Sequence, residues 1–216
     1  MGEMKFISPF FLLFLVSSGH AKVLSKVVGV VGSHYVTSRE VQINSMMEQA
    51  LFGEKKINWQ SVIDRTDPQG KQFFNEVNSV LLEWIVGYEA EQFSITSVTE
   101  ENLKSSKTSL EKKLTALPPW RQLRASNSEI EKSLKRKLMA KQFIRFKVDS
   151  SYVPVTDVEV EEFFRKNQNQ FAGASLTQKK EEIKSLLGRQ KVEQRLQEWF
   201  EVLQKKYKVR NFVATT

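Results

Sequence analysis

Two histidines and a cluster of carboxylates are the side chains that first suggest metal or acid–base chemistry. His20 follows an N-terminal apolar run, and His34 follows a Gly-Ser pair without a cysteine or acidic motif at a ligand spacing. Glu159, Glu161 and Glu162 stand at the start of a predicted helix, where carboxylates stabilise the positive end of the helix dipole. The chain has no cysteine, no glycine-rich phosphate loop and no nucleophile elbow. We therefore expect no catalytic centre, no metal site and no cofactor.

Flexible and aromatic side chains suggest polypeptide binding instead. Met46 and Met47 are adjacent, and such pairs adapt to irregular apolar surfaces. Trp59 and Trp120 lie among polar residues in segments that resemble loops. Each of these side chains could instead pack in the hydrophobic core. For the methionine pair, core packing is the more frequent role.

A strongly basic segment is the third candidate for binding. Residues 104–147 contain thirteen Lys or Arg and three acidic residues, a net charge of +10, while the whole chain carries +8. Lys135, Arg136 and Lys137 lie within this segment, and we select them as contacts for an acidic polypeptide. The alternative is an ordinary solvated helix face. If these residues bind, reversing their three charges should weaken association with acidic partners and leave the fold intact.

The N-terminus has the organisation of a secretory signal peptide. Lys5 precedes an apolar run at 6–16, and small residues follow up to Ala21, where we expect cleavage. The run is short for a transmembrane helix. We therefore predict export to the periplasm of a Gram-negative cell. Export argues against nucleic acid as a partner and favours acidic polypeptides or an anionic envelope surface.

Capping patterns and apolar periodicity predict a mostly α-helical protein. Ser or Thr stands three residues before Glu or Gln, or Asp directly before Pro, at the start of several apolar stripes. These signals predict helices that begin near Thr37, Asp67, Ser97, Ser128, Thr156 and Ser175. The helix from Asp67 to about Phe93 has the widest apolar stripe, so we place it in the core.

Apolar strands at opposite ends of the sequence complete the predicted architecture. A hairpin covers 27–36, and a closing strand at 208–213 follows the last helix. We predict that the closing strand pairs with the hairpin in a small antiparallel β element, so that both ends of the mature chain build one body. The expected organisation is a signal peptide at 1–21, a helical domain at 22–154 and a segment at 155–216 that completes the same core.

The order of these elements resembles the SurA-type periplasmic chaperones. VVGVVGSHYVTSREV at 27–41 is similar to the opening hairpin and helix of that family, and VTDVEVEEFF at 155–164 is similar to a later helix. LQEWFEVL at 196–203, followed by Lys208 and Val209, resembles the last helix and closing strand. In that family, parvulin-type prolyl isomerase domains commonly lie between the later helix and the last one. Here only ten residues separate Phe164 from Ser175.

The resemblance therefore implies a SurA N-terminal-like chaperone core without an enzymatic domain. Its expected function is that of a periplasmic holdase, which binds unfolded outer-membrane proteins or other secreted polypeptides without catalysis. The first alternative is a helical adaptor that docks one folded envelope partner. The second is an isomerase that acts without its usual domain.

Overall fold

The structure is a computed structural model that describes residues 25–53, 56–94, 98–151, 153–171 and 173–213. The predicted signal peptide and the predicted cap at Ser97 lie outside these residues. The elements in chain order are β1 (Val27–Val31), β2 (His34–Thr37), α1 (Ser38–Phe52), α2 (Trp59–Arg65), α3 (Phe73–Phe93), α4 (Glu100–Leu114), α5 (Pro118–Leu123), α6 (Asn127–Ser150), α7 (Asp157–Lys166), the 3₁₀ helix η1 (Gln168–Phe171), α8 (Leu176–Lys206) and β3 (Arg210–Asn211).

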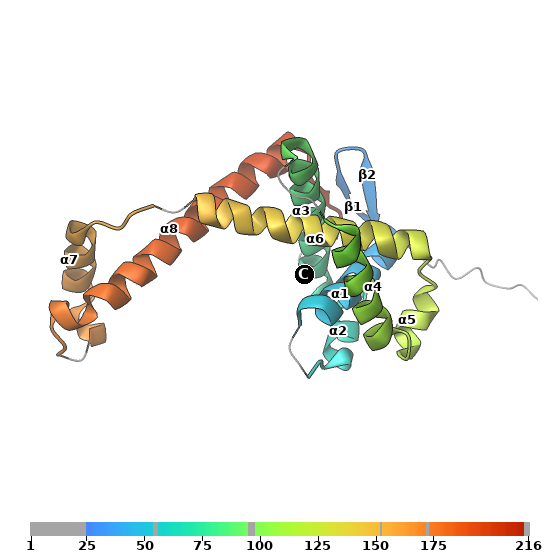
Figure 1. Ribbon diagram of the computed structural model, residues 1–216, viewed down its shortest axis with the longest axis horizontal. Coiled ribbons are helices and arrows are strands. Elements are labelled where there is room, and N and C mark those ends of the chain that lie inside the picture. Colours follow the sequence, from blue (N-terminus) through green and yellow to red (C-terminus); the bar gives the residue numbers. More distant parts are fainter. Residues whose placement is uncertain (1–24, 54–55, 95–97, 152, 172, 214–216) are drawn as a thin grey trace, which may run out of the picture.

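The molecule is mostly helical with a small antiparallel sheet of three strands, as the sequence predicted. Figure 1 shows an elongated shape in which α1, α2, α4, α5 and the hairpin gather around α3 and the first part of α6. In the same view, α7 and the first part of α8 extend away from this body on one side, and the last part of α8 returns to the top of α3.

The two ends of the described chain meet in one sheet with the strand order β2-β1-β3. β1 pairs antiparallel with β3, where Val30 lies opposite Arg210 and Gly29 lies opposite Asn211. A Cβ atom at Gly29 would lie 3.0 Å from both the Arg210 carbonyl oxygen and a Leu81 methyl group, so glycine permits this close approach. The predicted pairing of the first and last strands is confirmed, although β3 is shorter than the predicted closing strand.

The apolar residues form connected clusters around α3. Phe73 and Leu81 of α3 pack with both hairpin strands and with Leu203 near the end of α8. Met47 belongs to a second cluster between α1, α2, α4 and α6. Phe143 of α6 belongs to a third cluster, which α3 shares and which the aromatic residues of α8 cover. α3 contributes to the first and third clusters, which explains why its apolar stripe is so wide.

The segment formed by α7, η1 and the first part of α8 has an apolar cluster of its own, centred on Val155, Val160 and Ile183. Along α8, Ile183 and Leu203 are buried, and no residue between them is. Leu203 at the end of α8 and the residues that flank β3 pack against the main core, while the first part of the 155–216 segment packs as a separate unit on the other end of the same helix.

α3 begins at Phe73 and not at Asp67. The N–H of Gly70 donates to the Asp67 carbonyl at 2.8 Å, so these residues form a turn before the helix. The short side chain of Asp67 supports that turn by accepting from the N–H of Gln69 at 3.0 Å. The predicted caps at Thr156 and Ser175 are both present as reciprocal capping boxes.

The N-cap of α6 is Ser126 and not the predicted Ser128. The Ser126 hydroxyl accepts from the N–H of Glu129, and the Glu129 carboxylate accepts from the N–H of Ser126 at 2.8 Å. Arg39 of α1 also donates to this carboxylate, at 2.5 Å. These hydrogen bonds lower the pKa of the Glu129 carboxyl to about 2, and the one from Arg39 has the largest effect.

We expect the Glu129 contribution to stability to disappear in acid. A carboxyl group whose pKa is lower in the folded state stabilises the fold above its unfolded pKa of about 4.3, and the effect is lost as the pH falls through about 2. Glu129→Gln should therefore be less stable than the wild type at pH 7, by about 1 kcal/mol or less because the pair is partly exposed. Urea unfolding should show the two proteins converging near pH 2. A stability difference between the wild type and Glu129→Gln that stays constant with pH would contradict this role of Glu129. The same pH-dependent difference in the control Glu101→Gln would also contradict it.

Candidate functional site

Buried charges join α1, α3 and α6. Glu83 of α3 accepts from Arg136 Nε at 2.8 Å and from Lys137 Nζ at 2.5 Å. Only 11% of the Glu83 side chain and 4% of the Lys137 side chain are exposed. Glu48 of α1 lies at the surface end of this network, with its carboxylate 3.0 Å from Lys137 Nζ. The network fixes the relative position of three helices, since a buried charge is tolerated only with its partners in place.

Trp84 connects this network to the hairpin. The Arg136 guanidinium lies 3.8 Å from the centre of the Trp84 ring, and the His34 ring centre lies at the same distance from it. The indole N–H donates to Glu40 at 2.7 Å, and His34 Nε2 lies 3.1 Å from the other Glu40 oxygen. Burial disfavours the charged form of Glu40, but these hydrogen bonds and the charge of Arg136 outweigh it and lower the pKa of the carboxyl. His34 thus contributes to packing between the hairpin and α1.

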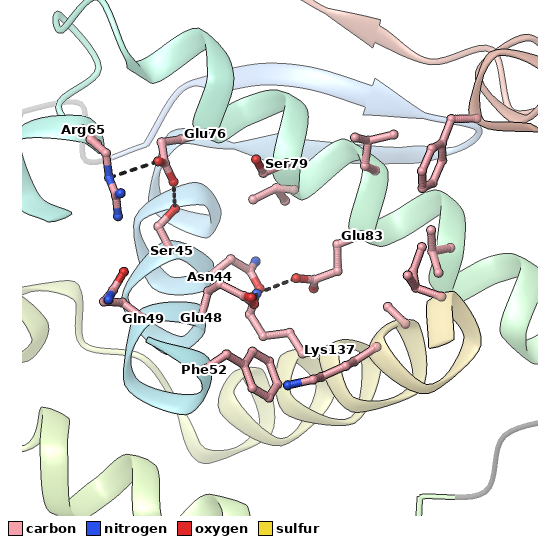
Figure 2. A pocket seen from close by; sticks show the side chains of 17 residues that line it. Asn44, Ser45, Glu48, Gln49, Phe52, Arg65, Glu76, Ser79, Glu83 and Lys137 are labelled. Atoms are coloured by element: carbon pink, nitrogen blue, oxygen red, sulfur yellow. Dashed lines mark hydrogen bonds and ion pairs between the residues drawn. The ribbon is translucent and has the colours of Figure 1, made fainter. Parts of the chain in front are cut away.

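A groove of about 560 Å³ lies between α1, α3 and α6, beside this network (Figure 2). Most of its apolar lining comes from α3 and α6, together with one aromatic residue each from α1 and α8. The main apolar residues are Val80, Leu82, Val86, Ala140, Ile144 and Phe200. Lys137, Glu83 and Glu48 form its polar middle, and Lys141 stands at the rim with its Nζ 3.6 Å from the centre of the Phe52 ring. An apolar floor interrupted by charged side chains suits a polypeptide segment that carries both kinds of residue.

The other end of the groove is polar. Arg65, at the C-terminal end of α2, lies with its Nε 3.3 Å from Glu76 Oε1, and Ser45 donates to Glu76 Oε2 at 2.6 Å. Figure 2 shows the Glu76 carboxylate between Arg65 and Ser45, with Gln49 also on this side of the view. The groove therefore changes along its length from apolar residues at α6 and α8 to polar residues at α1 and α2.

The predicted apolar contacts lie outside this groove. Met46 and Met47 are buried in the cluster between α1 and α4, so both have the core role that the sequence left open. Trp59 and Trp120 pack against the same cluster and are partly buried. The structure thus brings these four side chains together, as contributors to one apolar cluster.

The three predicted cations have different environments. Lys135 is exposed, Arg136 is largely covered, and Lys137 is buried. Charge reversal at all three positions would place acidic groups beside Glu83 and Glu40, so we withdraw the expectation that this change leaves the fold intact. The basic segment is therefore structural at Arg136 and Lys137 and solvated at Lys135.

The described part of the chain contains no cluster of three or more His, Cys, Asp or Glu residues that could hold a metal ion. Among the described helices, none is both long enough and apolar enough to cross a bilayer. Comparison with protein-family models, with curated proteins and with solved structures found no significant match for this chain.

Proposed function

We propose that this protein is a holdase of the cell envelope that binds unfolded outer-membrane or secreted polypeptides in the groove between α1, α3 and α6. The observation that carries the proposal is the open apolar floor beside a rigid ionic network. A holdase must offer apolar contact in a shape that persists without its client, and the ion pairs of buried Lys137 with Glu83 and Glu48 hold the three helices at a fixed spacing. The resemblance to SurA-type chaperones supports the same function, as a core without an isomerase domain.

The test is suppression of aggregation of a urea-denatured β-barrel protein after dilution. Near-stoichiometric amounts of the wild type should keep the client soluble. Ile144→Asp should remove most of this activity, because it places a charge on the apolar floor, and Ile144→Ala should reduce it less.

Val158→Asp is the matched control, because Val158 is 64% exposed on α7 and lies outside the groove. Thermal unfolding must show that Ile144→Asp remains folded. Equal loss of activity in Ile144→Asp and Val158→Asp, or protection by neither wild type nor control, would contradict the proposal.

The alternative function is an adaptor that docks one folded envelope partner. A second groove of about 630 Å³ supports it, since Val192 and Leu196 in the uncovered middle of α8 line it together with Val148 and Val155. A pull-down from an envelope extract should return many unfolded precursors if the protein is a holdase and one dominant folded protein if it is an adaptor.

A further inference from the structure

The polar end of the first groove contains an arginine whose donors are not fully used. Arg65 Nε is buried and makes no hydrogen bond, although it lies at ion-pair distance from Glu76. The side chain as a whole is 35% exposed, so its accessible donors are on the terminal nitrogens. The buried Nε is out of reach of a ligand, but the terminal nitrogens of this groove-lining guanidinium can bind a group from outside the chain.

Its neighbours hold the guanidinium in place without occupying it. Glu76 accepts from Ser45 through one oxygen and approaches Arg65 with the other, so its carboxylate is fixed on one side of the guanidinium. A guanidinium has five N–H donors in a planar fork and can therefore contact a second carboxylate while it keeps the first. The two oxygens of a ligand carboxylate match that fork better than a single acceptor does.

We infer that the groove selects polypeptide segments in which an acidic side chain is followed or preceded by apolar ones. Arg65 binds the acidic side chain, and the apolar residues near Ile144 and Phe200 bind the others. The inference rests on the proposed function and specifies the class of segment that the groove takes. The exposed cations among residues 104–147, such as Lys135 and Arg145, favour the same clients at long range, because they attract acidic chains during encounter.

Lys137 and Lys141 are the other cations that line this groove. Lys137 is buried and already paired with Glu83 and Glu48, and the exposed Lys141 places its Nζ over the Phe52 ring. Arg65 is 35% exposed and ion-paired to Glu76, which gives it the fixed geometry that bidentate recognition needs. For this reason we assign the acidic side chain of the bound segment to Arg65.

The experiment compares two short fluorescein-labelled peptides that differ in one residue, Glu or Gln, next to two Leu residues. Both peptides are acetylated and amidated, so that the only carboxylate is the Glu side chain. Fluorescence anisotropy gives the Kd for the wild type, Arg65→Met and Arg65→Lys. Arg145→Met is the matched control, because Arg145 is an exposed arginine on α6 outside the groove.

Arg65→Met should weaken binding of the Glu peptide about tenfold and leave binding of the Gln peptide unchanged. The Kd of Arg65→Lys for the Glu peptide should lie between those of the wild type and Arg65→Met, because lysine keeps the charge and loses the planar fork of donors. The inference is overturned if Arg65→Met weakens binding of both peptides equally, or if Arg145→Met weakens binding of the Glu peptide as much as Arg65→Met does. A wild type that protects denatured clients but does not distinguish the peptides overturns this inference alone, whereas a wild type without client protection overturns the proposed function.

Discussion

Replacing Glu83 with leucine should lower the free energy of unfolding by about 3 kcal/mol. The change leaves Arg136 and Lys137 without their shared carboxylate in a site where little of either side chain is exposed. Removing one partner of a buried pair commonly costs about 3–5 kcal/mol. We expect the lower end of that range because Glu48 and Glu40 remain within 3.0 Å and 3.5 Å of the two cations.

The second change, Lys137→Met in the Glu83→Leu background, should recover much of the loss, since an apolar pair can replace a buried ion pair at little cost. Glu111→Leu on α4 is the control, because Glu111 is exposed and makes no ion pair with a described residue. It should change stability by less than about 0.5 kcal/mol. Urea unfolding measures all four proteins. Equal stability of the single and double variants would show that the network does not hold the helices.

Phe143→Ala should destabilise the protein by about 3–5 kcal/mol. The side chain is 1% exposed, and its ring centre lies 5.7 Å from that of Phe93 and 5.9 Å from that of Trp199. It thereby joins the end of α3 to α6 and to α8. Its removal leaves a cavity at the point where these three helices meet.

Phe146→Ala is a closely matched control. Phe146 lies on the same helix with its ring centre 6.2 Å from that of Phe143, but it is 41% exposed. We expect this change to cost about 1 kcal/mol, because solvent already reaches the ring and little cavity forms. Thermal and urea unfolding of the two variants give the comparison. Similar losses in both would mean that total aromatic area, and not enclosure, decides stability here.

Local rules predicted much of the fold from the sequence. The hairpin and the caps at Thr156 and Ser175 follow from short-range patterns that the structure confirms. The pairing of the two chain ends is long-range, and it is also confirmed. The predicted start of α3 at Asp67 was wrong because Asp67 and Pro68 also suit a turn. The sequence does not show which geometry the next residues adopt.

The candidate site was harder to predict because it depends on which side chains meet across helices. Glu76 and Glu83 are seven residues apart on α3, so they lie on the same face of the helix. That spacing was the available signal for a buried polar contact. The partners Arg65 and Lys137 lie on other helices, and the basic pattern of α6 gave equal weight to buried Lys137 and exposed Lys135.

The meeting of β1 and β3 has a consequence for how the polypeptide acquires its shape. Val30 and Arg210 belong to the first and last elements of the described chain, so the central strand obtains its second neighbour only when every other element has been synthesised. Closing so large a loop carries an entropic cost that helix–helix contacts must first offset. We therefore expect the contacts among the helices around α3 to form before β3 pairs with β1.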